Sequence, residues 1–348
     1  MKKQAQFSEH IVGHKPQRET LSRLQSSDRL PSALALCGQP GIGKMLVAKE
    51  FCRSLLCETN AAQAKNSAYG GCGECRACRL IDGGNHPDFH FLKCSERDQA
   101  SVESIRETIS LLGLKAYAGS TRLLVFDDAE QLSVQAANIL LKTAEEPGAN
   151  TCLLFVTANQ SKMPATLLSR CQVLFFNPLS STDVATVLRR NGRHEASDEE
   201  DGESEAVSIE ELAMLADGSP GNVESLSQNL DLWRSIQNRL PSVVTGDFQT
   251  AVGFLNEISK DKQDLPLALT LMRIFARQRM YRETNEDLRL RWALLLSNLL
   301  AAARLVAERN ISGGYALNAA FGDFFGAGAA GPFMRLTNVP LMLDNVVV

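Results

Sequence analysis

The sequence predicts an α/β domain in the first half of the chain and an all-helical second half. Short apolar runs, typical of buried strands, end in glycine or polar residues and are followed by helical patterns; they include 34–37, 122–126 and 152–156. From Leu230 to Arg309 the pattern is helical throughout. With 348 residues, the chain is long enough for two or three domains, each with its own core.

The composition is that of an ordinary globular protein, with 44% hydrophobic and 22% charged residues. No run of eighteen apolar residues occurs, and no apolar stretch follows the first residues. We therefore expect no membrane span, no export signal and a cytoplasmic location. The net charge of −4 and the pI of about 5.8 do not indicate a general affinity for nucleic acid, so any DNA contact would come from a local patch. One basic cluster, which is also consistent with a solvated helix face, comprises Arg273, Arg277, Arg279, Arg282, Arg289 and Arg291.

The segment from Leu34 to Met45 lacks one residue of a complete phosphate-binding loop. The pattern G-x-x-x-x-G-K-[ST] is met by Gly38, Gly43 and Lys44, with a further glycine at Gly41. Such glycines allow backbone N–H groups to point at phosphate oxygens, and the lysine adds a positive charge. The last position should hold Mg²⁺ through a hydroxyl, but a methionine thioether is a poor ligand for this cation. The loop therefore indicates nucleotide binding with impaired hydrolysis, or a turn that only supports the fold.

Two adjacent acids, Asp127 and Asp128, follow the strand predicted at 122–126. A carboxylate at the end of such a strand would hold Mg²⁺ opposite the phosphate loop. The second acid is usually glutamate in enzymes that hydrolyse ATP at such a site. The shorter Asp128 would misplace the attacking water by about 1 Å, so a second hydrolytic position is degraded. Asp128 and Glu130 are also residues that a helix N-terminus favours.

Three of the nine cysteines lie close together: Cys72, Cys75 and Cys78. Overlapping C-x₂-C pairs in a chain without an export signal favour a metal over disulfides, and four thiolates form a closed structural Zn²⁺ site. Cys57 is our first choice for the fourth ligand, because a helix is predicted to end there and a polar insertion to begin. Cys52 and His86 remain alternatives.

Taken in order, these motifs resemble the clamp-loader branch of the AAA+ proteins. The set consists of 38–44, the three cysteines at 72–78, Asp127-Asp128-Ala-Glu130, 138–147 and Ser169-Arg170-Cys171. The resemblance covers roughly residues 7–180. It implies an α/β P-loop AAA+ domain with a zinc knuckle at 1–177, a small helical lid at 178–229, and an all-α collar domain for oligomerisation at 230–348.

The resemblance also implies roles for single residues. Arg170 would be an arginine finger that reaches the γ-phosphate bound by a neighbouring motor subunit, a contact typically worth ~10³–10⁵ in rate. The alternative is an arginine that caps a helix C-terminus. Thr157 and Asn159 lie where the family senses the γ-phosphate; threonine and asparagine are also common at strand ends without this role. Gly221 stands where motor subunits carry an arginine that touches the nucleotide.

The degraded hydrolytic positions, together with His86-Pro87-Asp88 after the cysteines, resemble a non-motor subunit of the bacterial replicative polymerase. The implied function is a stator that helps to load the sliding clamp onto primed DNA and hydrolyses little or no ATP itself; whether the chain is an enzyme stays open. The alternatives are the catalytic ATPase motor of the loader and a purely structural ring subunit that binds no nucleotide.

The implied cofactors are structural Zn²⁺ and, with weakened binding, ATP and Mg²⁺. The implied partners are the motor subunits and the delta subunit in a hetero-pentamer, with the clamp and primed DNA contacted through the assembly and no membrane involved.

Three further features are interpreted from the residues alone. His14 lies in a predicted loop, where it could touch an adenine ring or simply be a surface residue. The acidic run at 194–205 is interpreted as a solvated loop. The Gly/Ala-rich tail at 313–348 carries no chemistry that the sequence indicates.

Overall fold

The computed structural model divides the chain into two compact units, Met1–Glu224 and Ser225–Val348. It describes residues 10–26, 30–59, 69–96, 101–112, 121–146, 148, 150–192, 208–227, 229–246, 249, 253–255, 257–258, 265–309 and 313–322. The acidic run at 194–205 and the tail from 323 onward lie outside the described residues. Among the described helices, none combines the length and apolarity that crossing a membrane requires.

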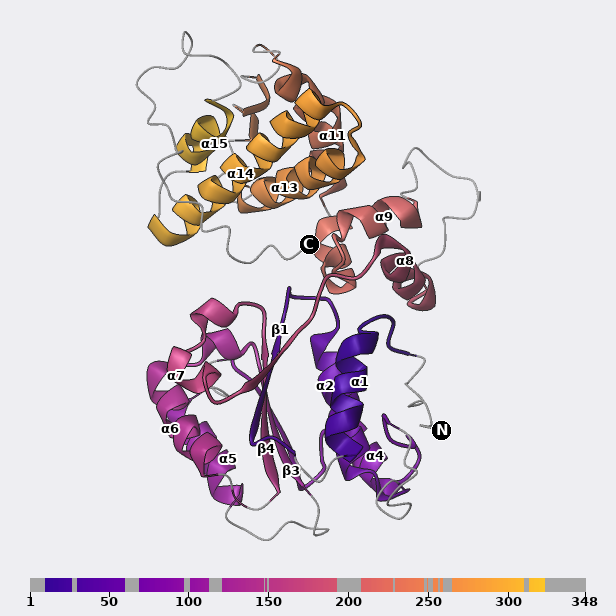
Figure 1. Ribbon diagram of the computed structural model, residues 1–348, viewed down its shortest axis with the longest axis vertical. Coiled ribbons are helices and arrows are strands. Elements are labelled where there is room, and N and C mark those ends of the chain that lie inside the picture. Colours follow the sequence, from indigo (N-terminus) through magenta and orange to yellow (C-terminus); the bar gives the residue numbers. More distant parts are fainter. Residues whose placement is uncertain are drawn as a thin grey trace. The chain divides into compact units, whose positions relative to one another are not determined.

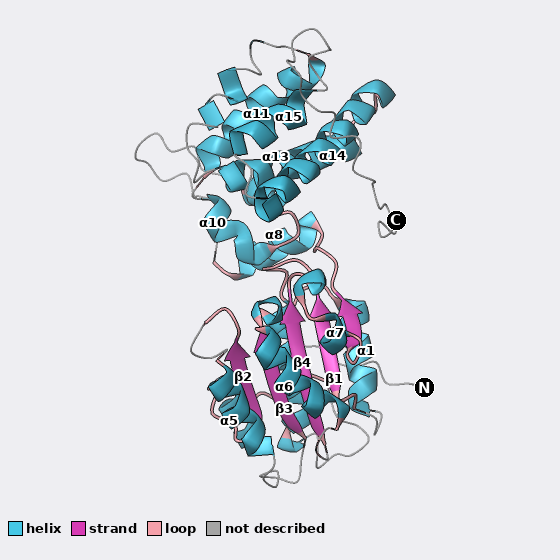
Figure 2. Cartoon of the chain, turned by 90° about the vertical axis from the view of Figure 1, so that its left-hand side faces the viewer, coloured by secondary structure: helices cyan, strands magenta, loops and turns pink. Residues whose placement is uncertain are grey.

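A five-stranded, all-parallel sheet forms the centre of the first unit (Figure 2). Its strands are β1 (Ala33–Cys37), β2 (Phe89–Lys93), β3 (Arg122–Asp127), β4 (Thr151–Thr157) and β5 (Gln172–Phe175). Their order across the sheet is β2-β3-β4-β1-β5. Because the strands are parallel, the carboxyl ends of β1, β3 and β4 lie at one edge of the sheet, where ligands bind in folds of this kind, and the order makes these three strands neighbours.

Helices cover both faces of the sheet, because neighbouring side chains of a buried parallel strand point to opposite sides (Figure 1). On one face, Leu34 and Leu36 share a core with residues of α1 (Lys15–Ser26), α2 (Lys44–Leu56) and α4 (Arg76–Asp82). On the other, Ala35 and Phe126 pack with α5 (Val102–Leu112), α6 (Val134–Glu145) and α7 (Ala165–Leu168). The α/β prediction for the first half of the chain is therefore confirmed.

The remaining helices of the first unit form a small group with a core of its own. These are α8 (Ser181–Arg190), α9 (Ile209–Leu215), the 3₁₀ turn η3 (Pro220–Asn222) and the start of α10 (Val223–Ser227). Val184, Leu188 and Leu212 belong to their shared core. Serine side chains cap the first two helices, since Ser180 and Ser208 each accept a hydrogen bond from a backbone N–H three residues later.

The regular elements described in the second unit are helices, chiefly α11 (Leu230–Thr245), α13 (Leu265–Arg282), α14 (Glu286–Arg309) and α15 (Gly313–Phe321). Their core includes Phe275, whose ring meets Trp233 and Trp292 edge-on at centroid distances of 5.8 and 5.7 Å. Four members of the basic cluster are exposed, as a solvated face requires, and two of these also contact the protein: Arg279 lies over the ring of Trp292 and Arg291 donates to the carbonyl of Val244. Arg273 and Arg277 are partly buried, so the six arginines do not all share one solvated face.

Candidate functional site

The phosphate-binding motif forms the turn between β1 and α2, in a conformation that requires its glycines. Gly41 and Gly43 have φ angles of +76° and +98°, which side chains other than glycine rarely adopt. A Cβ on Gly38 would lie 2.5 Å from the carbonyl oxygen of Phe176. The strand, turn and helix expected around this motif are therefore all present.

Lys44 begins α2 and its side chain is buried within the loop. Its Nζ donates to the carbonyl oxygens of Gly38 and Gln39 at 2.7 and 2.6 Å. Burial lowers the pKa of Lys44, while the charges of Glu130 and Asp127 act in the opposite direction. Lys44 is thus held by carbonyls of its own loop and lies within the field of two acids.

Of the two predicted acids at the end of β3, Asp127 agrees better with the expected role of holding Mg²⁺ opposite the phosphate-binding loop. Its carboxyl is half-buried, and this burial raises its pKa, whereas Lys44 acts to lower it. Asp128 is instead in a left-handed conformation with φ +52°, and its Oδ2 accepts a hydrogen bond from the hydroxyl of Ser95 at 2.6 Å. The carboxylate of Asp128 is therefore engaged beyond the end of β2.

Glu130 is a member of the site that our sequence reasoning assigned only to a helix N-terminus. The hydroxyl of Thr157 donates to its Oε2 at 2.7 Å, and the N–H of Ala158 donates to both carboxylate oxygens. Among the charges that raise the pKa of Lys44, Glu130 is the strongest. Its only sequence signal was an acid in the first turn after a buried parallel strand.

Of the other two predicted nucleotide-sensing residues, Thr157 is fully buried at the end of β4. Asn159 is exposed, and its side chain accepts a hydrogen bond from the N–H of Ser161 at 3.0 Å. Asn159 therefore caps the 3₁₀ turn η2 (Gln160–Lys162). The structure thus brings Thr157, but not the side chain of Asn159, into hydrogen-bond contact with Glu130.

The turn η3 packs directly on the phosphate-binding loop. The N–H of Gly221 donates to the carbonyl oxygen of Gly41 at 2.9 Å, and the hydroxyl of Ser219 lies 3.5 Å from Oε1 of Gln39. A Cβ on Gly221 would lie 2.9 Å from the Cα of Gly41. The absence of a side chain at Gly221 therefore allows two backbone segments to approach closely.

Met45 does not project from the loop toward the acids of β3. Its side chain is partly buried and packs against the apolar core shared by α1, α2 and the sheet. A hydroxyl-bearing residue would be needed here to hold a cation through oxygen. Met45 instead adds to the packing of α2.

His14 is a buried part of the loop's support, so its interpretation as a surface residue is wrong. Its Nε2 lies 2.7 Å from the carbonyl oxygen of Ile42, to which it must donate because a carbonyl only accepts. Its ring meets Phe176 edge-on with centroids 5.0 Å apart. Burial lowers the pKa of His14, which favours the neutral form of the ring.

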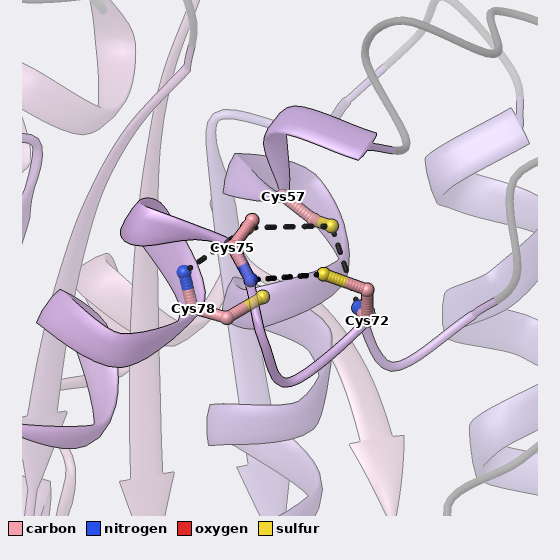
Figure 3. Close-up of side chains that lie close together, drawn as sticks. All are labelled: Cys57, Cys72, Cys75 and Cys78. Carbon is pink, nitrogen blue, oxygen red and sulfur yellow. Dashed lines mark hydrogen bonds between the residues drawn. The ribbon is translucent and has the colours of Figure 1, made fainter.

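The structure brings together four cysteine thiols, and the fourth is Cys57 (Figure 3). The sulfur atoms all lie within 4.8 Å of one another, and those of Cys57 and Cys75 are 3.9 Å apart. Sulfurs around a tetrahedral Zn²⁺ at 2.3 Å would be about 3.8 Å apart, so the arrangement fits a metal of this kind. Cys57 follows the end of α2, and α4 begins directly after Cys75.

Backbone N–H groups donate hydrogen bonds to three sulfurs of this cluster, while burial raises the pKa of the fourth thiol, Cys78. Cys72, Cys75 and Cys78 donate their N–H groups to the sulfurs of Cys57, Cys72 and Cys75, respectively, at 3.3 to 3.4 Å. Hydrogen bonds from the Thr59 hydroxyl and then from backbone N–H groups lower the pKa of Cys72 to about 6. A thiolate is the form that binds a metal.

The two alternative ligands are used elsewhere. Cys52 is fully buried in the core against the sheet, and that burial raises the pKa of its thiol. His86 accepts a hydrogen bond at Nδ1 from the N–H of Asp88. The packing of α2 thus turns Cys52 into the core and leaves Cys57, directly after the end of the helix, at the cysteine cluster.

Arg170 follows the short helix α7 and is exposed. Its Nη1 donates to the carbonyl oxygen of Thr166 at 2.8 Å, and its Nη2 forms an ion pair with Glu145 at the end of α6. The carbonyl contact agrees in part with the helix-capping interpretation. None of these partners belongs to the phosphate-binding loop.

Comparisons with known proteins show that the chain is similar to subunits of DNA polymerase III. The profile of a family described as "DNA polymerase III, delta subunit" matches residues 13–180. The DNA polymerase III subunit delta′ of Escherichia coli is 30% identical over 252 residues, which cover 70% of this chain and 69% of that protein.

Two further relatives are similar over shorter regions. The subunit delta′ of Pseudomonas aeruginosa is 32% identical over 212 residues, or 60% of each chain. The subunit tau/gamma of Haemophilus influenzae is 30% identical over 178 residues, or 51% of this chain and 25% of that protein. The match thus spans less than two thirds of the Pseudomonas relative and a quarter of the tau/gamma subunit.

Proposed function

This chain belongs to the family of DNA polymerase III delta′ subunits, and we propose that it is a stator subunit of a clamp loader. In this role it joins motor subunits and a delta subunit in a hetero-pentamer that loads the sliding clamp onto primed DNA. It supplies Arg170 to the ATPase site of a neighbouring motor subunit. Residues 1–177 form the AAA+ domain, 178–229 the lid and 230–348 the collar that joins the ring.

The exposure of Arg170 on a rigid base is the observation that carries this proposal. A residue that acts on a neighbour's phosphate must be accessible, and the side chain of Arg170 is 39% exposed. It must also be well positioned, and α7 is packed against α6 through Leu167 and Ala144, which belong to one core. A guanidinium is suited to phosphate because its donors are planar and fixed.

Three features support the proposal that the chain itself hydrolyses little or no ATP. Met45 packs into the core and offers no oxygen for Mg²⁺. Asp128 is hydrogen-bonded to Ser95. Gly221 contributes no side chain and instead brings the backbone of η3 against the loop. Each of these positions supports hydrolysis in the motor subunits that the chain resembles.

A catalytic motor is the second candidate, because the loop keeps its conformation. The three loop glycines, the buried Lys44 and the nearby Asp127 are the parts that bind phosphate and metal in a working site. The similarity to a tau/gamma subunit agrees with this alternative. A third candidate is a ring subunit that binds no nucleotide. ATP binding by the purified chain would separate this candidate from the stator and the motor.

We also infer that the metal held by the four cysteines is Zn²⁺. Thiolate ligands select Zn²⁺ over hard cations such as Mg²⁺ and Ca²⁺. Four protein ligands close the site, so the metal has a structural role. It ties the end of α2 to the start of α4, at the opposite end of α2 from the phosphate-binding loop.

The test is clamp-stimulated ATP hydrolysis by a reconstituted loader that contains the parent chain, Arg170→Ala or Lys44→Ala. We expect Arg170→Ala to lower the rate strongly and Lys44→Ala to leave it near that of the parent. Arg189→Ala is a matched control, because Arg189 is also exposed and paired with a glutamate, Glu210. A rate that depends on Lys44 instead would identify this chain as a motor subunit.

A further inference from the structure

The ion pair between Arg170 and Glu145 joins two elements that are firmly packed together (Figure 1). Glu145 is the last residue of α6, and Arg170 lies two residues beyond the end of α7. Their side chains are 48% and 39% exposed, so the pair lies at the surface. The backbone beneath it is fixed, because Ala144 and Leu167 are buried in the same core.

Glu145 is poorly placed to stabilise its own helix. The C-terminal end of a helix carries a partial negative charge, which disfavours a carboxylate in the last turn. Here α6 ends on Glu145 and is followed by a second acid, Glu146. Arg170 supplies the positive charge that compensates for Glu145.

The guanidinium of Arg170 is held by two elements and retains donors for a further ligand. Nη1 donates to the carbonyl oxygen of Thr166 at 2.8 Å and to the hydroxyl of Ser169 at 3.4 Å, and Nη2 pairs with Glu145. Arginine has five N–H groups. Among the contacts of the described residues, Nε–H and one N–H of Nη2 are therefore left over. A carboxylate and a phosphate can thus bind the same guanidinium at once.

We propose that Glu145 is a positioning residue for Arg170, which holds the guanidinium in the orientation in which it meets the γ-phosphate of a neighbouring subunit. This inference rests on the proposed function of Arg170 as a finger. An unpaired arginine side chain samples many rotamers, and ordering them on contact with phosphate opposes the reaction. Glu145 and the Thr166 carbonyl order the side chain before the neighbour arrives, which is the advantage of preorganisation.

The expected effect is modest, because the pair is exposed. Exposed ion pairs contribute little, so losing this one should lower the rate that depends on Arg170 by about fivefold. That rate is defined as the difference between the parent loader and the loader with Arg170→Ala. The decrease should fall on kcat and leave KM for ATP unchanged, because Glu145 acts on the neighbour's site through its ion pair with Arg170 and has no proposed role in binding nucleotide.

The experiment compares Glu145→Gln with Glu146→Gln in the reconstituted loader, alone and combined with Arg170→Ala. Glu146→Gln removes the adjacent charge at the same helix end and serves as the control. We expect the loss with Glu145→Gln alone, and no further loss when Arg170 is already alanine. Thermal unfolding of both variants checks that the fold is intact.

Each other result overturns the inference. A Glu145→Gln rate equal to that of the parent, or to that of Glu146→Gln, shows that Glu145 does not position Arg170. A higher rate shows that Glu145 competes with the phosphate. If Arg170→Ala itself leaves hydrolysis unchanged, the finger role fails and the inference falls with it; the Arg170→Ala measurement distinguishes this outcome from the others.

Discussion

Replacing Gly221 with alanine is expected to detach the turn η3 from the phosphate-binding loop. The N–H of Gly221 donates to the carbonyl oxygen of Gly41 at 2.9 Å, and the two backbones touch. An added Cβ would lie 2.9 Å from the Cα of Gly41 and 3.1 Å from its oxygen. Both are backbone atoms that cannot rotate away, so the turn must move.

The size of the effect follows from these contacts. Overpacking by a methyl group costs about 1–3 kcal/mol, and loss of the hydrogen bond adds about 1 kcal/mol, for a total of about 2–4 kcal/mol. This cost opposes only the contact between turn and loop, because α8 and α9 have a separate core around Val184 and Leu212. The variant should therefore open locally and remain folded.

Hydrogen–deuterium exchange of residues 38–44 and 219–222 measures this opening. We expect exchange in the Gly221→Ala variant to be faster by about 30- to 1000-fold, the factor that corresponds to 2–4 kcal/mol. Gly83→Ala is the control, because Gly83 has φ −80° and the nearest atom to its added Cβ is 3.5 Å away. Equal exchange in the two variants would refute the reasoning.

Three further predictions follow from buried groups and from the cysteine cluster. In the parent, Nε and Nη2 of the buried Arg18 donate to Glu50 at 2.8 and 2.5 Å. Glu50→Gln leaves this arginine without a carboxylate and should lower the free energy of unfolding in urea by about 3–5 kcal/mol. An unchanged unfolding midpoint would contradict this. Burial lowers the pKa of His14 below its ordinary 6.5. This group therefore has no effect on stability well above that pH and destabilises the fold as the pH falls below it. Unfolding of the parent and of His14→Gln at pH 7.5 and 5.5 should show that the variant loses less free energy of unfolding between the two pH values. Elemental analysis should find about one Zn²⁺ per chain in the parent and less in Cys57→Ser. A chelator should therefore lower the Tm of the parent by more than that of the variant. Equal zinc in both would exclude Cys57 as a ligand.

Local sequence patterns were sufficient for features that depend on neighbouring residues. Gly38, Gly43 and Lys44 predicted the strand, turn and helix around the loop, because that backbone path needs glycine at fixed spacing. The spacing of Cys72, Cys75 and Cys78 likewise predicted a metal cluster, since three thiols within one turn and a short helix must lie close together. The order of these motifs along the chain was enough to indicate the family, which the comparisons then confirmed.

The pairing of residues distant in sequence was decided only by the tertiary structure. Sequence spacing left Cys57, Cys52 and His86 as candidates for the fourth ligand, and the packing of α2 placed Cys57 at the cluster. It also gave no sign that Glu130 would accept a hydrogen bond from the hydroxyl of Thr157, since β3, which Glu130 follows, and β4, which ends at Thr157, are neighbours only in the folded sheet. The physical reason is the same in each case: a motif reports the conformation of a short segment, whereas burial and charge pairing depend on which segments the core brings together.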